Sequence, residues 1–481
     1  MPESLLSLDV GTSGVRAALF DDAGNETRAI KIMRNTDQLS DFTELDPNVI
    51  VAEVVAAVDQ LVASIPSTQR IEVITISTFW HSLLGVDASG SPTTKLLTWA
   101  DTRATATAKE LRREFPEAEI HLRTGCRFHS SYWPAKMRWL QQNQKVPFNR
   151  ASLWLGFAEY LCLHLFGAPI ASISMSSATG LFNQRTCDWD WDFVAALNIS
   201  KQTLPPIQHH IDVPLTQDYS SRWPALSNAR LRVIVGDGAA NNVGGGCCSK
   251  DRIALMVGTS GAMRVVFAGK PPDQLPESLW SYRIDSRRVV VGGALSDGGG
   301  LYRWLKDSFV LSEDSEEETS VMEPDSHGLT LLPFWSGERS TGWTGDARGA
   351  ILGLTQKTRP VEIVRAALES IAYRFALISQ ALEQVAPNSH IAATGNALRS
   401  SPVWLQIIAD VLGKQLSFGG SPEASIRGAA LLGLEAVGKI GSIEDVTVEV
   451  EKVVAPNLYR HGRYQHAIAR QEYFYQKLIS E

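Results

Sequence analysis

Two copies of one short pattern decide the fold: LDVGTSGVRAALF at Leu8–Phe20 and LMVGTSGAMRVVF at Leu255–Phe267. In each copy an apolar run leads into Gly-Thr-Ser-Gly and then into a second run that favours a β-strand. This order predicts a β-hairpin whose tip exposes backbone N–H groups and hydroxyls. Such a tip can cradle phosphate oxygens. A single copy could reflect common turn composition, but two copies half a chain apart predict a duplicated domain with one phosphate-binding turn in each half.

The sequence around the two copies alternates between strand-like and helix-like segments, which indicates an α/β fold. Strands are expected at 71–77, 231–235, 289–292 and 391–394, and helices at 49–64, 154–166, 301–309, 361–385, 402–412, 425–437 and 463–479. A glycine run at Gly244–Gly246 separates the halves without a low-complexity linker. We therefore expect one domain over residues 1–246 and a second over 251–481.

Composition narrows the class of protein. The 481 residues carry a formal net charge of −7, spread along the chain, which argues against binding a nucleic-acid backbone because that needs clustered Lys and Arg. The start, MPESLLSLDVG, lacks the basic stretch of a signal peptide, and the most apolar segment, 153–167, is too short to span a bilayer. Five cysteines without a CxxC spacing predict neither disulfides nor a zinc site. We expect a soluble, cytoplasmic protein that binds no membrane.

Glycine-rich turns that carry Asp, Thr, Ser or Asn follow several of the expected strands. Glycine lets backbone N–H groups approach an anion closely, and an aspartate at a strand end can hold a metal-bound water. Phosphoryl transfer needs this combination, because its catalysis is mostly positioning and charge neutralisation. The chain contains no GxxxxGK[ST], HExxH or GxSxG motif, so P-loop, zinc-peptidase and α/β-hydrolase chemistry are not indicated. The turns are Asp9–Gly14, Gly236–Gly246, Gly258–Gly261, Gly292–Gly300 and Gly395–Asn396.

These turns and several longer landmarks resemble the FGGY carbohydrate kinases of the actin-like, hexokinase-type ATPase superfamily, over almost the whole chain. The family's second signature is matched in full by GAILGLTQKTRPVEIVRAALE at Gly349–Glu369, and further landmarks are WADTR at Trp99–Arg103, GDGAANN at Gly236–Asn242 and LPFWSGERSTGW at Leu332–Trp343. The resemblance implies two duplicated actin-like (ribonuclease H-like) domains with a catalytic cleft between them.

The resemblance also implies roles for individual residues. Asp237 matches the catalytic base that takes the proton from the attacking sugar hydroxyl, and Asp9 matches the position that orients magnesium through water. The cofactors implied are ATP and Mg²⁺. The residues that match the ATP-binding positions of the family are Thr12, Ser13, Arg16, Gly258, Thr259, Gly299, Gly395 and Asn396.

On the sugar side, Trp80 and His81 occupy the polyol-binding positions of the family. His81 could hydrogen-bond a hydroxyl or, if protonated, a carboxylate. Asp101 and Arg103 are predicted to bind substrate as well, although a structural ion pair between them is an equally good interpretation. The text HSLLGVD together with WADTR resembles gluconate kinases more than xylulose kinases.

The leading hypothesis is therefore ATP-dependent phosphorylation of a terminal hydroxyl of a small sugar or sugar acid, with D-gluconate first. A xylulokinase, or a kinase of another pentulose or polyol, is the alternative. A non-catalytic actin-like ATPase switch is a distant third, because a pure switch needs no base for a sugar hydroxyl. The expected partners are the sugar and ATP, and the resemblance suggests a homodimer.

Overall fold

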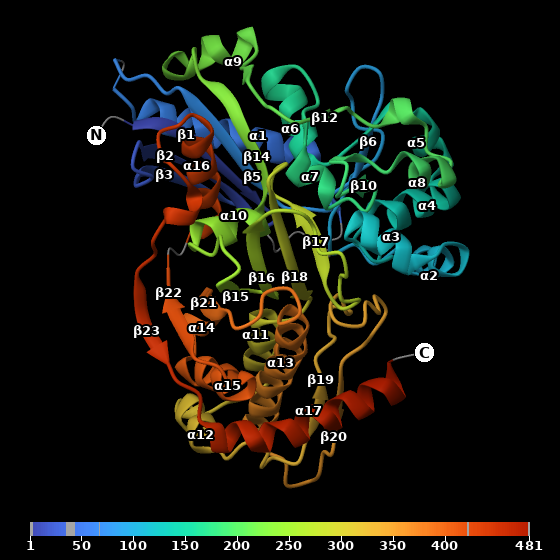
Figure 1. Ribbon diagram of the computed structural model, residues 1–481, viewed down its shortest axis with the longest axis vertical. Coiled ribbons are helices and arrows are strands. Elements are labelled where there is room, and N and C mark those ends of the chain that lie inside the picture. Colours follow the sequence, from blue (N-terminus) through green and yellow to red (C-terminus); the bar gives the residue numbers. More distant parts are fainter. Residues whose placement is uncertain (1–2, 35–43, 67, 421–422, 480–481) are drawn as a thin grey trace.

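Two large sheets form the frame of the protein. The computed structural model describes residues 3–34, 44–66, 68–420 and 423–479. The first sheet has the order β13-β14-β5-β1-β2-β3. Its strands are β1 (Glu3–Gly11), β2 (Gly14–Asp21), β3 (Glu26–Met33), β5 (Val73–Thr78), β13 (Val213–Pro214) and β14 (Arg230–Gly236). In Figure 1 this sheet lies in the upper part of the molecule, and the second sheet lies below it.

The second sheet repeats the plan of the first, with the order β17-β18-β16-β15-β21-β22-β23. In both sheets a hairpin strand pairs antiparallel with its partner on one side and parallel with a later strand on the other. The predicted duplication and hairpins are therefore confirmed. The strands are β15 (Arg252–Val257), β16 (Gly261–Ala268), β17 (Trp280–Arg283), β18 (Arg288–Leu295), β21 (His390–Thr394), β22 (Leu416–Gly419) and β23 (Val450–Val454).

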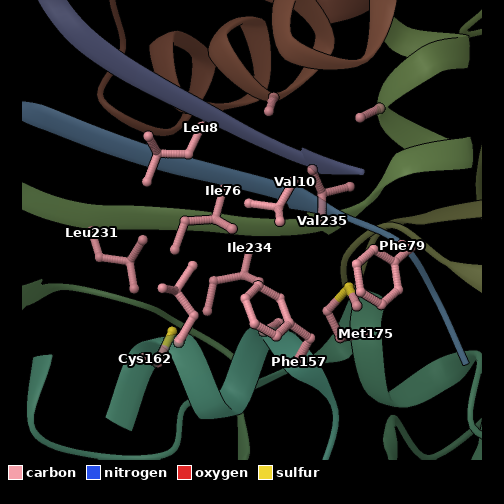
Figure 2. Packing of buried hydrophobic residues seen from close by; sticks show 14 of the residues in the cluster. Leu8, Val10, Ile76, Phe79, Phe157, Cys162, Met175, Leu231, Ile234 and Val235 are labelled. Carbon is pink, nitrogen blue, oxygen red and sulfur yellow. The ribbon is translucent and has the colours of Figure 1, made fainter. Parts of the chain in front are cut away.

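One face of the first sheet packs on α1 (Pro47–Ala63) and α6 (Phe157–Phe166). Side chains alternate along a strand, so every second residue of β1 reaches this face. Figure 2 shows Leu8 from β1 and Ile76 from β5 in the same packed cluster as Cys162 and Phe157 of α6. The central strands are thereby held rigidly from their apolar side.

The opposite face of the first sheet is covered by α10 (Asp237–Gly244) and by α16 (Ala424–Ala436), a helix from the second half of the chain. Ser7 on β1 donates a hydrogen bond from its hydroxyl to the carbonyl of Ile426, at 2.9 Å. Figure 1 shows α16, in orange-red, beside β1 and β2. The strands of the first sheet come before the predicted boundary at 246–251, and those of the second sheet come after it. Helix α16 follows the boundary in the sequence but packs on the first sheet.

Helices α10 and α16 approach so closely that only glycine fits at their contact. A Cβ atom added at Gly428 would lie 1.8 Å from the carbonyl oxygen of Ala240, and one added at Gly244 would lie 1.9 Å from that of Ala424. Both obstacles are backbone atoms, which cannot rotate away. The contact therefore couples α16 directly to the helix that begins at Asp237.

The second sheet packs on a core formed mainly by α13 (Pro360–Leu382) and α15 (Pro402–Leu412). The other helices of this half are α11 (Gly299–Ser308), α12 (Ser315–Val321), α14 (Asn396–Ser400) and α17 (Leu458–Leu478). In the first half, the segment between β7 (Leu96–Leu97) and β14 holds α2 (Thr105–Glu114), α3 (Glu117–Thr124), α4 (Trp133–Asn143), α5 (Lys145–Arg150), α7 (Ile173–Ser177), α8 (Trp191–Ala196) and α9 (Gln217–Arg222). Across the described residues, no helix combines the length and apolarity needed to cross a membrane.

Short strands complete the structure: β4 (Glu44–Leu45), β6 (Leu84–Val86), β7 (Leu96–Leu97), β8 (Leu153–Leu155), β9 (Ala171–Ser172), β10 (Phe182–Asn183), β11 (Asp188–Trp189), β12 (Ile207–Gln208), β19 (Thr330–Leu332) and β20 (Ala350–Leu352). The helix expected at 154–166 begins later than predicted. Leu153–Leu155 pair with β6 as a strand, and the helix starts at Phe157, after Gly156. The pairing of Leu153–Leu155 with β6, which is distant in the sequence, outweighs the local helical pattern of these residues.

Candidate active site

A cavity of about 270 Å³ lies where the edges of the two sheets meet. From the first half it is lined by residues that follow β1, β5 and β14, which are parallel neighbours and so end at the same edge of the sheet. From the second half it is lined by the β15–β16 turn, by β16 and β17, and by the loop around Arg339. Among the predicted site residues, those on its wall are Thr12, Ser13, Trp80, His81, Asp237, Gly258 and Thr259.

Asp237 is the first residue of α10 and faces this cavity. One of its carboxylate oxygens accepts the backbone N–H of Gly238 at 2.8 Å. Burial raises the pKa of Asp237 above its ordinary value, and the nearby positive charge of Arg264 partly opposes that rise. A raised pKa makes this carboxylate a stronger proton acceptor, as a general base requires.

The indole of Trp80 lies flat against the turn that carries Asp237. A Cβ atom at Gly236 would sit 1.9 Å from the Trp80 ring, and one at Gly238 would sit 2.6 Å from it. The glycines of the GDG sequence therefore make room for the aromatic wall. Trp80 also makes an edge contact with the Tyr282 ring of β17, at 5.1 Å between centroids, which joins the two halves across the cavity.

His81 is presented to the cavity in a left-handed backbone conformation, with φ of 68°. Its Nδ1 lies 2.7 Å from the carbonyl oxygen of Ala178. A carbonyl only accepts, so Nδ1 carries the proton and Nε2 is left as an acceptor. Burial lowers the pKa of His81 to about 3, so the ring is neutral. Of the two predicted roles, the geometry suits acceptance from a hydroxyl rather than binding of a carboxylate.

The two Gly-Thr-Ser-Gly turns face each other across the cavity, with Thr12 and Ser13 on one side and Gly258 and Thr259 on the other. Gly299, at the start of α11, donates its N–H to the carbonyl of Gly258 at 2.8 Å. Gly395 has φ of 110°, and a Cβ atom there would lie 2.2 Å from the carbonyl oxygen of Val257. Gly299 and Gly395 thus support the second turn from behind. Neither they nor Asn396 are among the described residues on the cavity wall, and their role in binding ATP stays a prediction.

Asp9 lies near the end of β1, beside the first turn. Its pKa is raised to about 7, mainly by burial and also by the negative charges of Asp237 and Glu423, while a hydrogen bond from Ser77 and the charge of Arg16 oppose the rise. A carboxylate kept from ionising by burial and by like charges is the kind of group that a divalent cation would stabilise. The donors present at this position therefore fit the magnesium role that the resemblance implies.

Arg16 lies on β2 and is engaged elsewhere. Its guanidinium forms ion pairs with Glu26 at 2.7 Å and with Glu423 at 2.6 Å. In the part of the chain that the structure describes, it does not line the cavity. Its predicted contact with the transferring phosphoryl group stays a prediction.

Asp101 and Arg103 form an ion pair at 2.6 Å, and Arg103 also reaches Glu44 at 2.8 Å. Arg103 stacks over the ring of Trp139, 4.8 Å from its centroid. Neither side chain is among the described residues on the cavity wall, where Trp99 of the same WADTR sequence is found instead. The geometry matches the structural interpretation of this pair, and their role in substrate binding stays a prediction.

Sequence reasoning missed several residues of the wall. Arg264 and Arg339 bring positive charge into the cavity, and Trp99, Tyr132, Trp280, Tyr282 and Trp343 line it with rings. One signal was present for Arg264, because it is the single charged residue in the strand GAMRVVFA. The aromatic residues come from strand β17 and from loops far apart in the chain, so no single local pattern could have grouped all of them.

Known proteins share this architecture along their whole length. A gluconokinase from Bacillus subtilis (strain 168) is 30% identical over 472 residues, covering 93% of this chain and 90% of that protein. A gluconate kinase structure from Lactobacillus acidophilus superposes with a TM-score of 0.89 at 26% identity, covering 99% and 98% of the two chains. A xylulose kinase structure from the same organism also gives 0.89, at 25% identity and 98% coverage of both.

Models of whole protein families assign the chain to a family more directly than its similarity to any single relative does. The N-terminal domain of the FGGY family of carbohydrate kinases matches residues 4–217. The C-terminal domain of the same family matches residues 253–437. Together the two matches span most of the chain and most strands of both sheets, with β14 and β23 outside them, and the protein that folds this way is a carbohydrate phosphotransferase. The chain belongs to the FGGY family of carbohydrate kinases.

Proposed function

We propose that the protein transfers the terminal phosphoryl group of ATP to the terminal hydroxyl of a sugar acid, D-gluconate before others. The observation that carries this proposal is one cavity that holds a buried carboxylate, two glycine-rich turns and two arginines, Arg264 and Arg339. Burial lowers the pKa of Arg264 to about 10, so it remains charged at neutral pH. Two guanidinium groups beside the single carboxylate Asp237 suit an anionic sugar better than a neutral one.

In this proposal Asp237 accepts the proton of the attacking hydroxyl as the new oxygen–phosphorus bond forms and the bond between the terminal phosphorus and its bridging oxygen breaks, which releases ADP. His81 accepts a hydrogen bond from a hydroxyl farther along the sugar through Nε2, and Trp80 packs against the carbon chain. Thr12, Ser13 and Thr259 bind phosphoryl oxygens of ATP from the two sides of the cavity. Asp9 would hold Mg²⁺ through water, and the ion would supply charge neutralisation on the phosphates.

An assay of ADP release over a panel of sugars tests the proposal. The panel contains D-gluconate, D-xylulose, glycerol, D-glucose and an ATP-only blank. We expect D-gluconate to give the highest kcat/KM, and the blank to be far slower because the enclosed cavity excludes water. A protein that phosphorylates none of these compounds would overturn the proposal.

D-Xylulose is the second candidate, because the xylulose kinase structure superposes as well as the gluconate kinase structure does. A neutral ketose would use His81 and Asp237 without needing the two arginines. A higher kcat/KM for D-xylulose than for D-gluconate would select this alternative.

The five cysteines, all buried and unpaired, support the expectation that the protein works in the cytoplasm.

A further inference from the structure

Arg264 stands out because it is a charged residue inside a buried strand. It lies on β16, where its neighbours along the strand, Met263 and Val265, are fully buried in the core of the second half. Its own side chain points the other way and lines the cavity, with 8% of the residue exposed. Burying a guanidinium is costly unless hydrogen-bond acceptors surround it. The buried guanidinium of Arg264 therefore needs a hydrogen-bond acceptor.

The protein leaves space for this side chain on both sides. Gly292 of β18 lies opposite Arg264 in the sheet, and a Cβ atom there would lie 2.9 Å from the Arg264 Cγ. A Cβ atom at Gly238 on α10 would lie 3.2 Å from both Cζ and Nε of the guanidinium. A larger residue at either position would displace the side chain. Two glycines from different elements thus form a slot that aims Arg264 at the cavity.

The guanidinium that fills this slot is unsatisfied. Nε and Nη1 of Arg264 are buried and have no hydrogen-bond partner among the residues that the structure describes. Arg339 differs, because its Nη2 donates to the carbonyl of Leu295 at 2.9 Å and its guanidinium stacks on Trp99 at 4.8 Å. Arg339 therefore has one protein acceptor, although its Nε is also buried without a partner in the described ranges, whereas the Arg264 guanidinium donates no hydrogen bond to the described residues.

The group that fits this fork is a planar anion. A carboxylate accepts two parallel hydrogen bonds from an arginine, one from Nη2 and one from Nε or Nη1, which gives both strength and orientation. His81 cannot bind such a group, because its ring is neutral and offers Nε2 only as an acceptor. Asp237 neutralises part of the Arg264 charge but forms no ion pair with it within 4.0 Å in the described ranges.

We infer that Arg264 binds the carboxylate of the substrate and makes the enzyme selective for sugar acids over neutral sugars of the same length. This inference rests on the proposed function. It predicts that D-gluconate is preferred over D-glucitol, in which a CH₂OH group replaces the carboxylate. It also predicts that the preference is lost with the guanidinium.

The test compares Arg264→Met, which keeps the length but not the charge, with Arg264→Lys, which keeps the charge but not the fork. We expect kcat/KM for D-gluconate to fall roughly 10- to 100-fold in Arg264→Met, the range for a hydrogen-bonded charge. The change should lie mainly in the KM for D-gluconate, with the KM for ATP unchanged. Because any effect on Asp237 is shared by both substrates, kcat/KM for D-glucitol should fall much less than that for D-gluconate, and Arg264→Lys should be intermediate.

Arg283→Met is the matched control, because Arg283 is also a buried arginine of the same sheet but hydrogen-bonds the protein carbonyls of Gln184 and Gly269. It should leave the ratio of D-gluconate to D-glucitol activity unchanged. That ratio does not depend on how much of each variant is folded. Where Arg264→Met gives no folded protein, Arg264→Lys and calorimetric binding of both compounds to the unmodified enzyme decide the matter.

Three outcomes would overturn the inference. They are an unchanged ratio in both Arg264 variants, a rise in the KM for ATP alone, and equal affinity of the unmodified enzyme for D-gluconate and D-glucitol. A rise in the KM for ATP would mean that Arg264 binds a phosphate instead. An unmodified enzyme that does not phosphorylate D-gluconate at all would contradict the proposed function itself, which is a separate result.

Discussion

The Nζ atom of Lys136 lies 2.6 Å from the main-chain carbonyl oxygen of His81. Lys136 is fully buried on α4, and burial lowers its pKa to about 7. His81 needs such support because its left-handed φ of 68° is costly for a residue with a Cβ atom. The lysine thus holds in place the backbone that presents the His81 ring to the cavity.

Removing this support should harm sugar binding more than ATP binding. Lys136→Met would leave the His81 carbonyl buried without a donor, at a cost of about 1–3 kcal/mol in the free energy of unfolding. We expect a matching fall in urea midpoint and a higher KM for the sugar, with the KM for ATP unchanged. Lys145→Met, on the exposed helix α5, is the control. Wild-type KM values for the sugar in Lys136→Met would contradict the role assigned to this contact.

Replacing the proposed base should stop turnover without preventing binding. Asp237→Asn keeps the size of the side chain but cannot accept a proton, so kcat should fall roughly 10²–10⁴-fold. The affinities for ATP and sugar, measured by calorimetry, should change little. Asp218→Asn, on the exposed helix α9, should behave as the unmodified enzyme. Near-normal turnover in Asp237→Asn would show that the base lies elsewhere.

The rate should fall on the acid side at a pH above the ordinary pKa of an aspartate. Asp237 must be ionised to act, and burial raises its pKa, so activity is present above that raised value and is lost as the pH falls through it. Because Arg264 lowers the pKa of Asp237, Arg264→Met should shift the acid limb to higher pH. A pH profile of kcat/KM tests both statements. An acid limb at or below pH 3.8 would contradict the first of them.

The dependence of turnover on the Mg²⁺ concentration should show whether Asp9 belongs to the metal site. Chelation of the metal should abolish turnover, since the phosphate charge would then be left without its cation. Asp9→Asn should raise the Mg²⁺ concentration required for half-maximal rate, and added Mg²⁺ should restore part of the activity. Asp22→Asn, in the half-buried turn after β2 where Asp22 pairs with Lys439, provides the comparison. An unchanged Mg²⁺ requirement in Asp9→Asn would remove this residue from the metal site.

The glycine contact between α10 and α16 should tolerate no side chain. In Gly428→Ala the new methyl would meet the Ala240 carbonyl, and overpacking of this kind costs about 1–3 kcal/mol. The urea midpoint should fall accordingly, and kcat should fall with it because α10 begins at Asp237. Gly441→Ala introduces a methyl with no atom within 4 Å, so its midpoint should not decrease. Equal midpoints for the two variants would contradict the argument.

Local sequence patterns predicted the parts of the fold that local sequence determines. The two hairpins follow from apolar runs on either side of a turn, and α13 and α15 from their helical spacing. The placement of α16 on β1 was not predictable, because it depends on a contact between residues about 400 positions apart, such as Ser7 and Ile426. No pattern within a window of 20 residues contains that information.

The residues of the candidate site also divide into those that the sequence predicted and those that only the folded chain reveals. The glycine-rich turns were predicted because apolar runs lead into them, although Gly292–Leu295 continue β18 and Asp237–Gly244 form α10. The role of Asp237 was predicted from the family resemblance. Arg264 was missed because a single charge within an apolar strand has several ordinary explanations. Only its depth, its two flanking glycines and its unpaired donors, which are properties of the folded chain, give it a role.

The position of α16 has a consequence for how the chain folds as it is synthesised. Leu5, Phe20 and Val73 form part of a cluster that Ile426 and Leu434 complete. At 5–20 residues per second, the ribosome needs roughly 10 to 40 s to proceed from the end of the first half to α16. During that interval the first sheet has left the exit tunnel with an apolar face uncovered. The nascent chain therefore offers a binding surface to a chaperone until residue 436 emerges.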